Sequence, residues 1–136
     1  LSVRENLRIP VEMELGLARR LRTTRERAAT IHARVDELLE LGGLSKHALR
    51  RAGEPAHGDQ RAVEIMMALA LRPSLLLLDE PTAGMGHEET HLIVALEIAD
   101  RAYVLDNGRI VYEGTAAALR RDEARVRALA GATSGN

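Results

Sequence analysis

The sequence has no cysteine, tryptophan or phenylalanine, and only two tyrosines among its 136 residues. The lack of cysteine excludes disulfides and thiolate metal sites, and it fits a reducing compartment. With so few aromatic side chains the core must be aliphatic, and the stacking platform that binds single-stranded nucleic acid is missing. The formal net charge of -1 provides no basic field either. We therefore expect no nucleic-acid partner.

Long hydrophobic runs are also missing. The longest ones, IMMALAL and LLLL, are far shorter than the ~20 residues that a membrane-spanning helix needs. The opening LSVRENLRIP has no signal-peptide pattern, so we expect a chain that is soluble or at most peripheral to a membrane. The length suits one domain of ordinary size.

Capping signals and apolar spacing predict helices in the first half of the chain. Ser2 followed by Glu5 forms a capping box that opens a short helix, which we expect Pro10 to disturb. The chain is therefore expected to begin within a domain. Two histidines, His32 and His47, are expected to lie on solvated helix faces.

Two longer helices are predicted before the first strand. Thr23 with Glu26 repeats the capping signal, and apolar residues follow at helical spacing until Gly42 and Gly43 stop the helix. A second helix is expected over about residues 58 to 71, because Pro73 prevents it from continuing. The residues expected on its inner face are Val63, Met66, Met67 and Ala70.

Residues 75 to 78 are apolar without alternation, which is typical of a strand covered on both faces, although a short buried helix is the main competitor. Two carboxylates follow. A strand end would hold Asp79 near a Mg²⁺ shell and let Glu80 polarise an attacking water. The simpler interpretation is a strand that ends in acids before a turn.

The second half of the chain is predicted to form a strand, a turn, a helix and a hairpin. Helical spacing resumes over residues 87 to 100. Asn107 and Gly108 then stand between two β-prone runs, which is a strong hairpin signal because both residues tolerate positive φ. Thr115 is placed to cap a last helical segment, which is expected to continue to about Leu129.

The stretch HGDQRAVEIMMALALRPSLLLLDEPTAGM, residues 57 to 85, closely resembles the ATP-binding subunits of ABC transporters from the signature loop to the D-loop. The resemblance implies that Asp79 is an indirect Mg²⁺ ligand at the end of the Walker B strand and that Glu80 is the catalytic base. It implies a signature loop that contacts nucleotide through Ala56, His57, Gly58, Asp59 and Gln60. It also implies a D-loop that touches the opposing subunit, formed by Ala83, Gly84, Met85 and Gly86.

The resemblance covers nearly the whole chain and implies an α/β fold class. The fold would be a partial P-loop NTPase (ABC ATPase) domain, with a helical subdomain followed by a small parallel sheet and a C-terminal β-hairpin. Within one domain over residues 1–136, we expect the helical subdomain and signature helix over 1–72 and the Walker B strand, D-loop, helix and hairpin over 73–114. The C-terminal helical tail would occupy 115–136.

The long insertion in the helical region and the sequence EIMMALALRPSLLLLDEPTAGM resemble the branched-chain amino acid importers most. The implied cofactors are ATP and Mg²⁺. The implied partners are a second ABC ATPase subunit and a transmembrane permease. The implied location is cytoplasmic, peripheral at the inner face of the cell membrane.

Several family features do not occur in these residues. The sequence has no G-x-x-x-x-G-K-[ST] (Walker A) loop to cradle phosphates, no adenine-stacking aromatic and no Q-loop glutamine. The spacing between Thr90 and Asp100 is short by roughly two dozen residues, one helix plus one strand, so the switch histidine is missing and His91 does not replace it. In the signature loop, Pro55 and Ala56 stand where leucine and serine are common.

These departures predict that the isolated chain is inactive as an ATPase. The function that the resemblance implies is that of an ATP-binding and ATP-hydrolysing subunit, as a fragment, of an ABC importer for branched-chain amino acids. The alternative function is a non-catalytic interaction module that pairs with an intact ABC ATPase or a permease. They also suggest how the sheet closes: we expect residues 75 to 78 and 102 to 105 to pair directly in parallel at about 4.8 Å.

The segment HEETH, residues 87 to 91, matches the H-E-x-x-H zinc pattern of metallopeptidases, with Glu88 as the general base. No third ligand is evident after it, and His87 falls in the first turn of the expected helix. We therefore expect no zinc chemistry.

Overall fold

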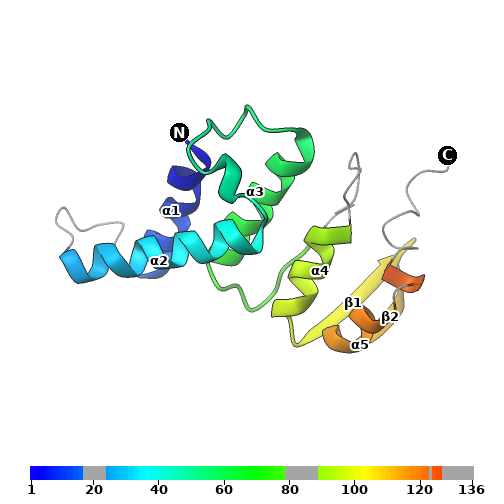
Figure 1. The fold of residues 1–136 in the computed structure, drawn as a ribbon. Helices are drawn as coiled ribbons and strands as arrows, with labels where there is room; N and C mark the ends of the chain where they lie inside the picture. The colour runs from blue at the N-terminus through cyan, green and yellow to red at the C-terminus, as the bar shows by residue number, and fades with distance from the viewer. Residues whose placement is uncertain (17–23, 79–88, 123, 127–136) are drawn as a thin grey trace. The chain divides into compact units, whose positions relative to one another are not determined.

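The structure, a computed structural model, describes residues 1–16, 24–78, 89–122 and 124–126. The chain divides into two compact units, residues 1–77 and residues 78–136. In Figure 1 the helices of the first unit run from blue to green, and the helices and strands of the second run from yellow-green to orange. Each unit is described by itself below.

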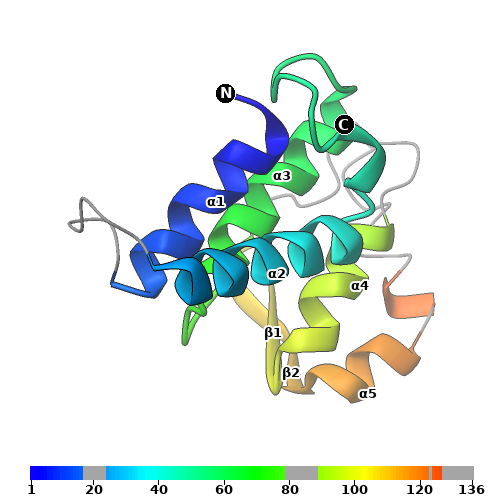
Figure 2. The same ribbon diagram turned by 60° about the vertical axis from the view of Figure 1, so that its left-hand side comes forward.

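The first unit is helical. It contains α1 (Val3–Glu14), α2 (Arg25–Leu41), the 3-10 helix η1 (Ser45–His47) and α3 (His57–Ala70). α1 packs against both α2 and α3, and the two views show it alongside α3 with α2 crossing the pair (Figures 1 and 2). The sequence therefore predicted the helical character of this unit and the place of α3 to within one residue at each end.

α1 begins as the capping box predicts, because the Ser2 side chain accepts from the Glu5 N–H and the Glu5 carboxylate accepts from the Ser2 N–H at 2.7 Å. The expected disturbance at Pro10 is wrong. Pro10 lies inside the helix and is buried. A proline in a helix interior costs about 3 kcal/mol relative to alanine, and burial of the apolar face of α1 against α2 and α3 offsets that cost.

The N-cap of α2 lies one residue later than predicted. Thr24 is the N-cap, and its Oγ1 accepts a hydrogen bond from the Arg27 N–H at 3.3 Å. Thr23 lies outside the described residues. The helix ends at the predicted glycines, since Gly42 is the C-cap and Gly43 has a φ of +65°. A positive φ of this kind favours glycine, which explains why the helix stops there.

The core of the first unit is aliphatic, as the composition predicted. Its side chains come from one face of each helix and from the turn after α2. Each of the larger ones contributes about 1.5–3 kcal/mol by burial. The residues buried in this way are Val3, Leu7, Val11, Ile31, Val35, Leu38, Leu39, Leu44, Ala62, Val63, Ile65, Met66, Leu69 and Ala70.

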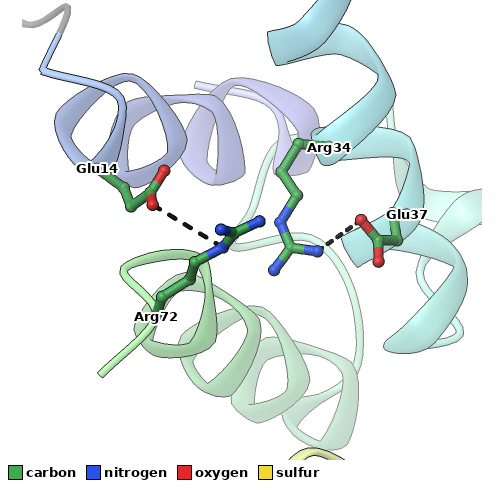
Figure 3. A network of polar contacts seen from close by, with 4 residues as sticks. All are labelled: Glu14, Arg34, Glu37 and Arg72. Atoms are coloured by element: carbon green, nitrogen blue, oxygen red, sulfur yellow. Dashed lines mark hydrogen bonds and ion pairs between the residues drawn. The ribbon is translucent and has the colours of Figure 1, made fainter. Parts of the chain in front are cut away.

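Ion pairs occur both between and within these helices. The Arg72 Nε lies 3.8 Å from the Glu14 Oε1 and so links the residues after α3 to the end of α1. Within α2, Arg34 pairs with Glu37 at 2.5 Å (Figure 3). Figure 3 shows the Arg34 and Arg72 side chains extending into the space between the three helices. Exposed pairs of this type contribute at most about 1 kcal/mol each.

The second unit contains α4 (Glu89–Ile98), β1 (Arg101–Asp106), β2 (Arg109–Thr115) and α5 (Ala116–Arg121). α5 packs against α4 and both strands, and Arg120 of α5 pairs with Glu97 of α4 at 3.1 Å. The Thr115 side chain caps α5 by accepting from the Ala118 N–H at 3.2 Å, as predicted. The small core consists of Leu96, Ala116, Leu119 and Val126, with Leu92, Ala102, Val104 and Tyr112 packed against it.

The predicted hairpin is confirmed. β1 and β2 pair antiparallel around Asn107 and Gly108, whose φ angles of +47° and +75° are those of a type I′ turn. The register shifts between Val104 and Leu105, which marks a β-bulge.

The predicted parallel sheet is wrong in the part of the chain that the structure describes. The sheet found there has two strands, β1 and β2, and they are antiparallel. Residues 75–78 are not a strand and therefore do not pair with residues 102–105. Leu75 and Leu77 are 70% and 82% exposed. An apolar run becomes a strand only when a second strand satisfies its backbone groups, and no segment among the described residues does so for residues 75–78.

Candidate functional site

The N-terminus of α3 is where the structure describes the residues that the resemblance assigns to the signature loop. Ala56 is the N-cap, and its side chain makes no capping hydrogen bond. Within the described residues, the N–H groups of His57, Gly58 and Asp59 have no acceptor, and the first helical bond runs from the Gln60 N–H to the Ala56 carbonyl at 3.0 Å. An uncapped helix start with free N–H donors can bind an anion.

The loop that leads into α3 is held by Gln60. Its Nε2 donates to the Pro55 carbonyl at 2.8 Å and to the Gly53 carbonyl at 3.3 Å. The Glu54 N–H also donates to the Arg51 carbonyl at 3.0 Å. Gln60 is therefore occupied in fixing the approach to the helix, while the three N–H groups before it remain available.

Packing fixes α3 behind this end. Val63, Met66 and Ala70 are buried as the helical spacing predicted, and Met67 is half-buried. A helix anchored along its inner face presents the donors of its first turn in a fixed direction. Such preorganised donors are what binding of a phosphate group requires.

His47 is the residue of this site that sequence reasoning missed, and the expectation that it lies on a solvated face is wrong. It is 9% exposed, and its Nε2 lies 3.1 Å from the Asp59 Oδ2. Neither ring nitrogen makes an aligned hydrogen bond, and the contact is an ion pair only when the imidazole is protonated. No sequence pattern marks this pair, because it is the turn after Gly43 that brings η1 against the start of α3.

The other predicted site residues, Asp79, Glu80 and the D-loop from Ala83 to Gly86, lie outside the described residues, as does most of HEETH. Their roles remain predictions. Elsewhere in the described part of the chain, no group of three His, Asp or Glu side chains could hold a metal ion. None of the helices that the structure describes is both long enough and apolar enough to cross a membrane.

Comparison with known proteins gives a consistent result. The family model described as "ABC transporter" matches residues 1–83. A high-affinity branched-chain amino acid transport ATP-binding protein, LivG of Escherichia coli, is 34% identical over 116 residues, which cover 68% of this chain and 46% of LivG. The methionine import ATP-binding protein MetN of Rhizobium johnstonii is 37% identical over 136 residues, with 83% of this chain and 35% of MetN covered.

A probable amino-acid ABC transporter ATP-binding protein of Sinorhizobium fredii is 38% identical over 105 residues and matches 60% of this chain and 41% of its own length. This chain thus spans less than half the length of these relatives. A solved ATP-binding cassette of an ABC transporter superposes with a TM-score of 0.54 at 25% identity, covering 93% of this chain and 62% of that one. The superposition confirms the predicted α/β class, a partial ABC ATPase fold.

Proposed function

This chain belongs to the ABC transporter family, and we propose that it supplies the signature-loop side of an ATP site in an amino-acid importer of the branched-chain type. The observation that carries the proposal is the start of α3. The residues matched by the family include an uncapped helix end at the signature-loop position, with the loop before it held by Gln60. Its three free N–H groups suit phosphate oxygens.

ATP and Mg²⁺ are the implied ligands, and the residues present fit only part of that role. The α3 N-terminus offers donors for phosphate oxygens through His57, Gly58 and Asp59. By the resemblance, Asp79 would hold Mg²⁺ indirectly and Glu80 would act on the attacking water. Bound ATP supplies the phosphoanhydride bond whose hydrolysis drives transport in the family. The cradle for the triphosphate must come from residues other than these 136, because no Walker A sequence is among them.

The proposed partners follow from the family resemblance. A signature loop acts on nucleotide held by a second ATP-binding subunit, so that subunit is the first partner we propose. A transmembrane permease is the second, with the chain peripheral at the cytoplasmic face of the membrane. The solute class rests on the names of the relatives, which include both branched-chain amino acid and methionine proteins.

A non-catalytic role is the second candidate. Within these residues the sequence lacks both a phosphate loop and a switch histidine. A chain of this kind can lend its signature loop to an intact ATPase without hydrolysing ATP at a site of its own. Asp79 and Glu80 would then be dispensable, whereas Gly58 would not.

Complementation of a disabled partner tests the proposal. An intact branched-chain-type subunit with an inactivated signature loop is mixed with the full chain, and MgATP hydrolysis is measured. We expect the chain to raise the rate on the order of tenfold, since one removed electrostatic contact to a reacting group costs that much or more. Gly58→Val should abolish the increase because the side chain obstructs the phosphate, whereas Gly53→Ala, in the loop before α3, should keep it. An unchanged rate with the wild-type chain would refute the proposal.

A further inference from the structure

His47 is a buried polar residue for which the proposed function has no use so far. Its backbone is fixed, because its N–H donates to the Leu44 carbonyl at 2.8 Å and its carbonyl accepts from the Arg50 N–H at 2.9 Å. Its ring nitrogens are buried without an aligned hydrogen bond. Leaving a buried polar group unsatisfied costs about 1–3 kcal/mol, so a residue that served only to pack η1 would be better apolar, as the neighbouring Leu44 is.

The Asp59 carboxylate, which His47 contacts, gives this buried histidine a role. Asp59 is in the first turn of α3, next to the free N–H groups of His57 and Gly58. A carboxylate at this end of a helix interacts favourably with the helix dipole, and it repels any second anion that approaches the same donors. The signature loop of this chain therefore carries a negative charge at the point where phosphate oxygens would bind.

We propose that His47 is a positioning residue that holds and offsets the Asp59 carboxylate, so that the first turn of α3 can accept phosphate oxygens. The inference rests on the proposed function of this loop. The imidazole contacts the carboxylate at 3.1 Å from the interior of the first unit, on the side away from solvent. This contact holds the Asp59 carboxylate against the buried ring, where a protonated imidazole offsets its charge. The N–H groups remain free for a ligand.

The test uses the full chain and inorganic tripolyphosphate, with binding followed through the backbone amide signals of residues 57 to 59 in nitrogen–proton correlation spectra at constant ionic strength. His47→Phe preserves a ring of similar size and removes both nitrogens. We expect binding to weaken roughly three- to tenfold, the size of one uncompensated charge near a partly screened site. His47→Gln provides a second variant of similar polarity should the phenylalanine variant fail to fold.

Rescue separates this role from simple packing. Asp59→Asn removes the charge that His47 offsets, so the double variant His47→Phe, Asp59→Asn should bind tripolyphosphate within about twofold of Asp59→Asn alone. If His47 only fills space, His47→Phe will weaken binding by the same factor in the Asp59→Asn background as in the wild type. That result would overturn the inference and leave the proposed function standing.

A second measurement distinguishes failure of the His47 inference from failure of the proposed function. It uses the wild type, His47→Phe, Asp59→Asn and the double variant. Urea midpoints should show coupling between the two positions, with His47→Phe shifting the midpoint less in the Asp59→Asn background than in the wild type. Midpoint shifts that simply add would overturn the inference even if phosphate binds. If the midpoints are coupled but tripolyphosphate causes no saturable amide shift in the wild type, the contact between His47 and Asp59 exists and the proposed signature-loop function is wrong.

Discussion

Gly42, the C-cap of α2, provides a sharp test of how the first unit packs. A Cβ at this position would lie 2.8 Å from the Met66 Cγ, 3.1 Å from the Leu44 Cδ1 and 3.3 Å from the Leu38 carbonyl oxygen. Carbon atoms in ordinary contact are about 3.5–4.0 Å apart. Met66 and Leu44 are fully buried, so a shift of either side chain disturbs a close-packed core. Gly42→Ala therefore overpacks the contact between the end of α2 and α3.

The expected loss follows from two opposing effects. Overpacking a buried contact costs about 1–3 kcal/mol, and replacing glycine by alanine recovers about 0.4–1 kcal/mol through the unfolded chain. The φ of Gly42 is -81°, so backbone strain adds nothing. We expect Gly42→Ala to lower the free energy of unfolding by about 1–2 kcal/mol, or roughly 4–8 °C in Tm for each kcal/mol in a unit of this size.

The assay is urea unfolding of the full chain followed by circular dichroism. Gly53→Ala is the matched control, because a Cβ there meets nothing within 4 Å. It should be neutral or slightly stabilising. In a Met66→Ala background, which removes the clashing Cγ, Gly42→Ala should cost much less than in the wild type. The packing described here would be refuted if Gly42→Ala were as stable as Gly53→Ala.

Three further outcomes are expected. The Ser2 N–H, and secondarily its hydroxyl, lower the pKa of Glu5 by hydrogen bonding, so this stabilisation is complete above the unfolded carboxyl pKa and is lost as pH falls through the folded pKa. In acid titrations of stability Glu5→Gln should flatten that fall, and an unchanged curve would contradict the capping box. Gly108→Val should destabilise the hairpin by about 1–2 kcal/mol in thermal unfolding, because φ is +75°, whereas replacing Asn107 by glycine should be tolerated. Glu80→Gln should leave complementation of a signature-deficient partner intact, and loss of that activity would mean that the chain hydrolyses ATP itself.

Local signals were sufficient where the structure depends on a few neighbouring residues. The capping box at Ser2, the stop at Gly43 and the turn at Asn107 each satisfy backbone groups within a few residues. The extent of α3 followed from helical spacing and from Pro73, and the signature-loop position at its start followed from the family resemblance. These are interactions that a sequence window contains in full.

Long-range features were not accessible in the same way. The helix around Pro10 persists because α2 and α3 cover it, and residues 75–78 are not a strand because no strand in the described part of the chain lies beside them. The contact between His47 and Asp59 joins residues that no periodic pattern relates. Each outcome depends on which distant segment packs nearby, and apolar spacing within one segment does not contain that information.

The central claim is that this chain offers the signature side of a shared ATP site and does not hold the triphosphate alone. Sedimentation velocity tests it most directly, with the full chain mixed with an intact branched-chain-type ATP-binding subunit whose catalytic glutamate is replaced, in MgATP or MgADP. We predict a one-to-one complex in MgATP that is absent in MgADP and absent for Gly58→Val. The account would be contradicted if association ignored the nucleotide or if the chain bound MgATP at micromolar concentration without a partner.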